Sequence, residues 1–463
     1  MYSKFKNYAS LVTQRKYDAV CHIAETPDVM IFDPDSGENL LHIAITTGNR
    51  RLVRTLVASA PGLALHRNVM GCTPFLDALL LFDNDPELAR IILRHVPDAI
   101  NVPDARGYHP IHFVAMLAPD VDGRRLEFVA KHSERGLLVN GITPLMVAID
   151  SLKPSFENIR FLAEWDPDAV AHTTPMGTTA LHTSIHVSDD IVEYILDIAP
   201  HTATVVDAVG SLPIHRMAAS AKGMSTLRKL IRANPDGLAV QDILGRLPLH
   251  IAANTTNLWK NFETARVVFD AYPEAALVRD NRGRTPAHVA AASGSSADMM
   301  RMIRKYPHLI TMADERGRTM LHEITFQKHY NWHATASALI RMEPHIMFES
   351  DDYGEKPIHN LMELDVNPRE VGAVFTELAM HVPVTHYLQY LPKPCPGIAA
   401  ALPRALERSE NEASHIVKHM TPSEVRTLRT ALLVANRFDI NFISRDLACA
   451  AVAPANVLVS SSS

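Results

Sequence analysis

The sequence has 463 residues, of which 47% are apolar and 21% charged, and its net charge is −6. This composition can bury a large core and excludes a disordered or fibrous protein. The mild acidity argues against a general binder of nucleic acids. Four cysteines lie far apart without a C-x-x-C pair, so a disulfide framework is excluded and a reducing compartment is indicated.

The N-terminal segment lacks the features of an export or membrane signal. It carries Lys4, Lys6 and Asn7 instead of an apolar core, and no apolar stretch approaches the roughly 20 residues that span a bilayer. We expect an intracellular, cytoplasmic or nuclear, protein that contacts no membrane. Residues 1–26 hold two helical stretches, about Lys4 to Gln14 and Lys16 to Ala24, which we expect to form an N-terminal cap.

A short motif recurs along the chain at steps of 33 to 38 residues, as in GRTPAHVA, with ten glycines at its start: Gly37, Gly71, Gly107, Gly141, Gly177, Gly210, Gly245, Gly283, Gly317 and Gly354. A proline lies ten residues before nine of them, and Lys131 takes its place before Gly141. An aspartate lies three residues before six of them: Asp104, Asp207, Asp242, Asp280, Asp314 and Asp351. A fixed period of this size indicates a stacked repeat array.

These residues resemble the ankyrin repeat, whose signature is Asp-x-x-Gly-x-Thr-Pro-Leu-His-x-Ala followed by two antiparallel helices. The resemblance covers about residues 15 to 390, with the repeat array itself at residues 27–390, and implies an all-α solenoid of about ten repeats with short β-hairpin fingers. The Pro-x-Ala endings, such as Pro97 to Ala99 and Pro167 to Ala169, depart from the usual Gly-Ala ending and indicate a divergent subtype.

The physical chemistry of one unit leads to the same architecture. In the unit of Gly283, Thr285 can cap a helix that begins at Pro286, because proline is tolerated in the first turn. The second helix must stop before Pro307, and the residues from there to Gly317 have turn composition. One unit cannot bury its apolar face alone, so neighbours stack into a curved rod on the order of 90 Å long with a concave face.

The C-terminal residues depart from the repeat. A helix is expected from Pro422, behind a capping box of Thr421 and Glu424. We predict a helical cap or a small helical region over residues 391–452 and a disordered tail over residues 453–463.

The histidine content does not by itself indicate chemistry, because eight histidines occupy the same motif position: His42, His112, His182, His215, His250, His288, His322 and His359. We interpret them as buried structural residues that tie units together. His329 and His333 are spaced like zinc ligands on a helix, but no third ligand lies nearby. Nucleotide-binding and hydrolase motifs are absent from the sequence. No catalytic residue, metal or cofactor is therefore predicted.

The surface offers the candidate binding residues. In the resembled family the position after the motif glycine commonly faces a ligand, and three successive units place Arg246, Arg284 and Arg318 there, with Arg279, Arg282 and Arg316 beside them. Such a basic stripe can pair with carboxylates or phosphates. Tyr108 occupies the same position in an earlier unit, and Trp259, Tyr330 and Trp332 in the longer inter-helix segments are aromatic candidates.

We predict a non-catalytic, monomeric interaction scaffold that binds an acidic or phosphorylated protein along its concave face and fingers. One alternative is an adaptor whose repeats select a target while the C-terminal helices recruit a second machine, such as a ubiquitin ligase. A further alternative is an enzyme with an unrecognised C-terminal site.

Overall fold

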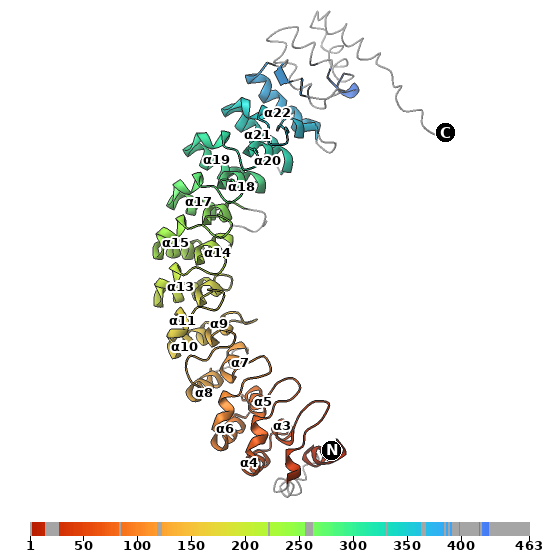
Figure 1. Ribbon diagram of the computed structural model, residues 1–463, viewed down its shortest axis with the longest axis vertical. Coiled ribbons are helices and arrows are strands. Elements are labelled where there is room, and N and C mark those ends of the chain that lie inside the picture. Colours follow the sequence, from red (N-terminus) through yellow and green to blue (C-terminus); the bar gives the residue numbers. More distant parts are fainter. Residues whose placement is uncertain are drawn as a thin grey trace, which may run out of the picture. The chain divides into compact units, whose positions relative to one another are not determined.

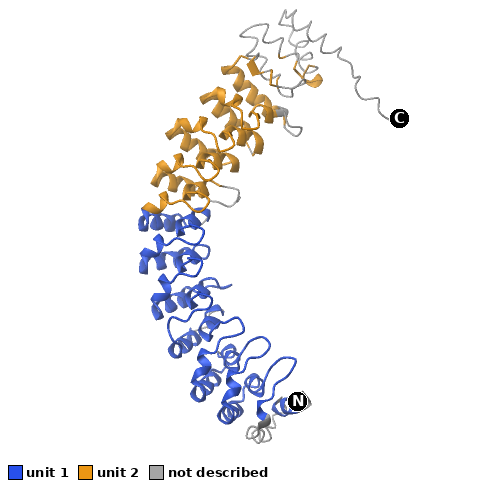
Figure 2. Ribbon diagram, in the orientation of Figure 1, with its two compact units in different colours: residues 1–235 blue, residues 236–463 orange. Residues whose placement is uncertain are grey.

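The computed structural model describes residues 2–13, 27–82, 85–117, 123–220, 223–254, 263–329, 331–362, 367–383, 386–387, 389–390, 398, 416 and 419–425. The chain divides into two compact units, Met1–Pro235 (unit 1) and Asp236–Ser463 (unit 2), shown in two colours in Figure 2. The regular secondary structure of the described residues is helical, with ten helix pairs that we number repeats 1 to 10 in chain order (Figure 1).

Unit 1 begins with one helix, α1 (Tyr2–Thr13), which packs against the first helix of repeat 1. Six pairs follow: α3 (Leu40–Thr46) and α4 (Arg50–Ser59), α5 (Pro74–Leu80) and α6 (Pro86–His95), α7 (Pro110–Met116) and α8 (Arg124–His132), α9 (Pro144–Ile149) and α10 (Phe156–Trp165), α12 (Ala180–Ser184) and α13 (Asp189–Ile198), α14 (Pro213–Ala219) and α15 (Met224–Ala233). A short helix, α11 (Asp168–Ala171), lies between repeats 4 and 5.

Unit 2 holds repeats 7 to 10. Their helices are α16 (Pro248–Ala253) and α17 (Glu263–Ala271), α18 (Pro286–Ser293) and α19 (Ser296–Lys305), α20 (Met320–Gln327) and α21 (Trp332–Met342), then the 3-10 turn η9 (His359–Met362) and α22 (Pro368–His381). Repeat 10 thus opens with a single short turn where the other repeats have an α-helix. In Figure 1 the first helices of successive pairs lie side by side within a unit, and so do the second helices.

The first helices begin where the motif predicts. The hydroxyl oxygens of Thr73 and Thr143 accept the backbone N–H groups of Leu76 and Met146, so each caps a helix whose first residue is proline. Proline fits there because its missing N–H would have no partner in the first turn. The prediction of helix starts at the Thr-Pro segment is confirmed at these repeats.

The second helices end at the predicted prolines, but the chain does not enter the finger at once. α4 and α19 end before Pro61 and Pro307, and a 3-10 turn follows in each case. These turns are η1 (Pro27–Met30), η2 (Pro61–Leu65), η3 (Pro97–Asn101), η4 (Pro200–Thr204), η5 (Pro235–Ala239), η6 (Pro273–Leu277), η7 (Pro307–Thr311) and η8 (Pro344–Phe348). These turns bury apolar residues such as Leu309 and Ile310. The buried apolar surface stabilises the turns.

The core runs along the stacked helices of each unit. In unit 2, α18 packs against α16, α19 and α20, and α21 packs against α22. Leu321 and Leu339 are fully buried at these contacts. Because each pair buries its apolar face against the next pair, the predicted all-α repeat solenoid is confirmed.

The fingers are tight turns in the structure instead of extended β-hairpins. Among the described residues, strand-like pairing is limited to three single bridges, between Phe32 and Asn39, Val139 and Ile142, and Ala313 and Thr319. In most repeats a side-chain hydrogen bond closes the turn within four residues, as the Asp280 carboxylate does by accepting the N–H of Arg284.

The ends of the chain are described only in part. The first half of the predicted N-terminal cap corresponds to α1, which buries Phe5 and Val12, whereas Lys16 to Ala24 lies outside the described residues. At the C-terminus the predicted capping box is present, since Thr421 Oγ1 accepts the N–H of Glu424 while the Glu424 carboxylate accepts the N–H of Thr421. Most of residues 391–452, and all of 453–463, lie outside the described part of the chain.

Candidate protein-binding surface

The shape of each finger is set by the aspartate three residues before the motif glycine. In repeat 8 the Asp280 carboxylate oxygen Oδ1 accepts the N–H groups of Arg282 and Arg284, both at 2.9 Å. The Asp280 N–H donates to the carbonyl of Arg284, and the Gly283 N–H donates to the carbonyl of Asp280. The turns of Asp104, Asp207, Asp242, Asp314 and Asp351 repeat this arrangement. The Asp marker in the sequence is therefore a turn staple.

Successive fingers in unit 2 are joined through their backbones. The N–H of Asn281 donates to the carbonyl of Leu244, that of Glu315 to Arg282, and that of Asp352 to Arg316, each at 3.0 Å. The residues at the tips are exposed, with 60% for Ile243, 51% for Leu244 and 77% for Tyr353. We call Ile243, Leu244, Arg282, Arg316 and Tyr353 the fingertip row.

Two of the three arginines that follow a motif glycine form ion pairs within their own fingers. The guanidinium Nη2 atoms of Arg246 and Arg284 lie 2.7 and 2.8 Å from Oδ2 of Asp242 and Asp280, whose side chains are 1% and 2% exposed. Burial alone would raise the pKa of Asp280, but the hydrogen bonds from Arg284 hold that pKa below its usual range. Each arginine thus offsets a buried carboxylate of its own finger.

Two further predicted arginines are also engaged inside the chain. Arg318 pairs with Glu323 of α20 at 3.2 Å, and Arg279 donates from Nη1 to the carbonyls of Gly283 and Ala313. We expected a continuous stripe of arginines available to a partner. This expectation needs correction, because four of the six arginines are already bonded to aspartate or glutamate side chains or to backbone carbonyls. Arg282 and Arg316 remain exposed, and their guanidinium groups pair with none of the described side chains.

The predicted aromatic residues are mostly not surface anchors. Trp332 is only 4% exposed, and its Nε1–H donates to the Glu370 carboxylate of α22 at 2.7 Å, so the prediction of a surface tryptophan is wrong. The reason is that α21 begins at Trp332 and turns this side chain toward the next repeat. Trp259 and Tyr330 lie outside the described residues. Tyr108 is half-buried, with its ring 6.1 Å from that of His112.

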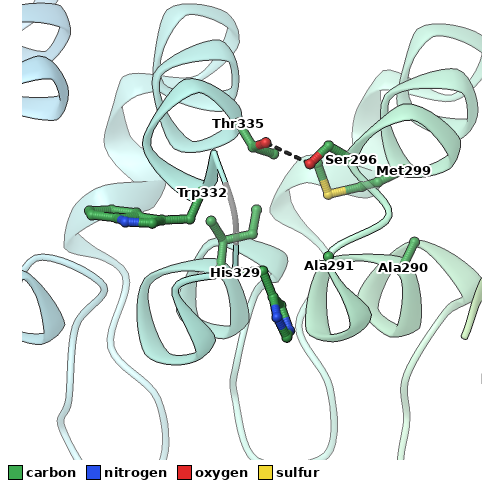
Figure 3. A pocket seen from close by; sticks show the side chains of 9 residues that line it. Ala290, Ala291, Ser296, Met299, His329, Trp332 and Thr335 are labelled. Carbon is green, nitrogen blue, oxygen red and sulfur yellow. Dashed lines mark hydrogen bonds between the residues drawn. The ribbon is translucent and has the colours of Figure 1, made fainter. Parts of the chain in front are cut away.

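The junction of repeats 8 and 9 near Trp332 leaves no room for a ligand. Figure 3 shows Ser296 and Met299 of repeat 8 across from His329 and Thr335 of repeat 9, with a hydrogen bond of 2.7 Å between Ser296 and Thr335, whereas the Trp332 indole points away from repeat 8. The hollow between them measures about 10 Å³, which is the size of about one water molecule. His329 places Nε2 2.7 Å from the carbonyl of Ala292, so this junction is a packing contact.

The motif histidines bridge consecutive repeats. Nδ1 of His288 accepts the N–H of Thr285, and its Nε2–H donates to the carbonyl of Met312 at 3.0 Å. The same inter-repeat bond runs from His42 to Cys72, His112 to Ile142, His182 to Ser211, His250 to Arg284 and His322 to Glu355. Nδ1 of His215 accepts the N–H of Leu212. His359 is half-buried, and its Nδ1 lies 3.1 Å from the Glu355 carboxylate.

These two bonds define the protonation state of the imidazole. Nδ1 must carry a lone pair to accept an N–H, and Nε2 must carry the proton to donate, so the ring is neutral. Burial lowers the pKa of His42, His112, His182, His250 and His288 to about 4. The repeats are therefore joined by neutral histidines at physiological pH.

The sequence reasoning missed the apolar fingertips. The residue just before the motif glycine is Met70, Met176, Leu244 or Tyr353 in four repeats, and each is exposed. A large apolar residue at the tip of a polar turn is the signal that could have revealed them, since nothing in the turn needs it.

Among the described residues, no helix is long and apolar enough to cross a bilayer, and no three metal-binding side chains converge.

Comparisons with known proteins found a likeness to a solved structure. No protein-family model and no curated protein matches the chain. A solved structure, the ankyrin repeat domain of Bcl-3, described as a unique member of the IkappaB protein family, is similar over 51% of this chain and 99% of its own, with 17% identity and a TM-score of 0.40.

The assignment of the repeats comes from their own geometry and motif. Repeat 8, for example, combines a Thr-Pro helix start, a second antiparallel helix, a turn closed by an aspartate and a histidine that bonds the next repeat. The chain therefore has the fold of an ankyrin-repeat solenoid, in which most second helices are followed by a proline.

Proposed function

We propose that the protein is a non-catalytic scaffold that binds a protein partner through the fingertip row of unit 2 and the adjoining face of first helices. The observation that carries this proposal is the row itself. Backbone hydrogen bonds hold five exposed residues of four repeats in register, and two are arginine and one is tyrosine. Arginine and tyrosine are enriched among the residues that dominate binding energies.

The chemistry of the row favours a partner that presents carboxylate or phosphate groups. Arg282 and Arg316 are exposed, and their guanidinium groups pair with no side chain in the described part of the chain, whereas Arg246 and Arg284 are paired within their own fingers. A planar guanidinium binds such anions through two parallel hydrogen bonds. Ile243, Leu244 and Tyr353 add apolar area on either side, so an acidic segment flanked by apolar residues fits the row.

The test compares two variants of the full chain with matched changes. The fingertip variant is Arg282→Glu/Arg316→Glu/Tyr353→Ser. The control variant, Arg304→Glu/Lys305→Glu/Met342→Ser, makes the same change of charge and also removes one large exposed side chain, but it does so at the ends of second helices. Circular dichroism first establishes that both variants are folded.

We expect a partner captured from lysate by the intact chain and the control to be depleted by at least about tenfold with the fingertip variant, which corresponds to about 1.4 kcal/mol. Quantitative mass spectrometry measures this ratio. If the fingertip variant retains every partner that the control retains, the row is not the binding surface and the proposal fails.

A further inference from the structure

A pocket of about 370 Å³ opens at the base of the fingers between repeats 9 and 10. One wall is formed by repeat 9, where Arg318, His322 and Phe326 follow one another at four-residue steps just before and along α20. The other wall is formed by Asp351 and Glu355 of the finger of repeat 10 and by His359 of η9. All of them belong to unit 2. The fingertip row uses none of these side chains.

Repeats 6 to 8 show one way in which the outer oxygen of a staple aspartate is compensated. In repeats 7 and 8 the residue after the motif glycine is an arginine, whose guanidinium binds Oδ2 of the staple aspartate, as Arg284 does to Asp280 at 2.8 Å. In repeat 6 the guanidinium comes from the helix instead, where Arg216 binds Oδ2 of Asp207 at 2.8 Å. Three repeats thus place a guanidinium against the outer oxygen of the staple.

Repeat 10 lacks an arginine at both of these positions. Glu355 follows the motif glycine, and Asn360 occupies the helix position that Arg216 has in repeat 6. Oδ1 of Asp351 accepts the N–H groups of Tyr353 and Glu355, but within the described part of the chain Oδ2 has no hydrogen bond or ion pair. Asp351 and Asn360 both line the pocket.

The charges around the pocket leave a surplus of negative charge. Arg318 is compensated by Glu323 at 3.2 Å, so it does not offset Asp351 and Glu355. Lys356 is turned away, because its Nζ donates to the carbonyl of Phe348 and to Ser350. His322 is kept neutral by burial, which lowers its pKa. Glu355 Oε2 lies 3.1 Å from Nδ1 of His359, so Asp351 is the pocket carboxylate whose Oδ2 has no cation beside it among the described residues.

We propose that this pocket receives an arginine side chain of the bound partner, which supplies between molecules the arginine–aspartate pair that repeats 6 to 8 form internally. The proposal rests on the scaffold function above. The exposed Phe326 ring, 55% accessible, offers an aromatic face to the planar guanidinium.

The first experiment uses defined probes on the full chain labelled with ¹³C at isoleucine methyl groups. The probe is acetyl-Gly-Gly-Arg-Gly-Gly-amide, and the comparison peptide carries citrulline, which keeps the shape of arginine but loses the charge. Ile324 and Ile358 lie beside the pocket residues in sequence and report binding by methyl chemical shifts. We expect the arginine peptide to bind at least about tenfold more tightly than the citrulline peptide, because only it forms the charged pair.

Three variants test the site. Asp351→Asn keeps the turn, since Asn68 staples the finger of repeat 2 by accepting the N–H of Cys72, but it should weaken the arginine peptide by at least about tenfold. Glu355→Arg fills the pocket from within, as Arg284 does in repeat 8, and should abolish binding. Asp352→Asn removes the same charge from the neighbouring exposed residue and should leave binding unchanged.

Equal shifts with the two peptides, or unaltered binding of the arginine peptide to Asp351→Asn, would overturn the inference. Failure here is separable from failure of the scaffold proposal. If captured partners are lost from the fingertip variant but kept by Asp351→Asn and Glu355→Arg, the scaffold function stands and the arginine pocket does not. If all these variants keep every partner, both proposals fail.

Discussion

Arg282 and Arg284 lie two residues apart on one finger and have different roles. The side chain of Arg284 folds back onto the buried carboxylate of Asp280, whereas that of Arg282 extends from the tip into solvent. The difference arises because the turn reverses direction at Gly283, which has a φ of 71°. Residue type alone does not separate a structural arginine from one available to a partner.

We predict that Arg284→Ala lowers the free energy of unfolding by about 2 kcal/mol, because it leaves the Asp280 carboxylate buried without a counter-charge. Arg282→Ala should change it by less than about 0.5 kcal/mol, since Arg282 is exposed and its side chain pairs with none of the residues that the structure describes. Urea denaturation of both variants measures the difference. Equal stabilities would contradict the assignment of Arg284 as a structural residue.

The motif histidines make stability depend on pH. An imidazole with a pKa of about 4 when folded and about 6.5 when unfolded binds fewer protons in the folded state at intermediate pH. Its contribution is complete above pH 6.5 and is lost as the pH falls toward 4. Each such histidine contributes up to about 3 kcal/mol, from about 1.4 kcal/mol per pKa unit.

We therefore expect the urea midpoint of the full chain to fall steeply between pH 6.5 and pH 4 and to be nearly constant from pH 7 to pH 8. His288→Asn should reduce the slope, because one buried imidazole no longer titrates, whereas His308→Asn should not, since His308 is exposed. A midpoint that stays constant down to pH 5 would show that the histidines remain protonatable when folded. The paired carboxylates of Asp207, Asp242 and Asp280 act in the same direction at lower pH, since their pKa values lie below the usual range.

At the scale of the element, the finger is a turn that tolerates only glycine at its corner. Gly283 has positive φ, and a Cβ added there would lie 2.6 Å from the backbone nitrogen of Glu315 in the next finger. Gly48, at the end of α3, has nearly the same φ of 70°, but nothing lies within 4 Å of an added Cβ. An alanine at Gly48 would therefore experience only the strain of a positive φ, whereas an alanine at Gly283 would also clash with the next finger.

Gly283→Ala should destabilise the protein by more than about 3 kcal/mol, because it adds a clash with the next finger to the strain of a left-handed alanine. Gly48→Ala should cost about 1 kcal/mol, which is the strain alone. Chemical denaturation compares the two. Similar losses at both positions would mean that the fingers of repeats 8 and 9 separate at little cost.

Local chemistry explains which parts of an element were predictable. Threonine followed by proline starts a helix through contacts within four residues, so the helix starts could be predicted at Thr73 and Thr143. The 3-10 turns after Pro61 or Pro307 were not predicted, because their stabilisation comes from burying Leu63 or Ile310 against neighbouring elements. The shortened first element of repeat 10 likewise escaped prediction from the motif GEKPIHNL.

At the scale of the whole molecule, stability follows from contacts between adjacent repeats. α21 packs against α20 and α22, and its residues Leu339 and Ile340 are fully buried there. In an array of this kind a perturbation acts on its own repeat and its neighbours and weakens along the stack. The effect of a core mutation should therefore remain near its site.

Leu339→Ala should cost about 2 to 5 kcal/mol of local stability by leaving a cavity in repeat 9. Hydrogen exchange followed by mass spectrometry should show lost protection in peptides of repeats 8 to 10. Peptides of repeats 1 to 3 should keep the protection that they have in the unchanged chain. Uniform loss of protection along all ten repeats would contradict an additive array.

The sequence by itself determined the repeat, its period, the helix starts and the positions of the motif histidines. These features depend on contacts within a few residues or recur ten times, so that local signals reinforce one another. Tertiary structure alone decided that Trp332 is buried, that Arg284 is committed to Asp280 and that Asp351 faces an open pocket. Those outcomes depend on which side chain the neighbouring repeat places within about 3 Å, and spacing along one chain does not encode that distance.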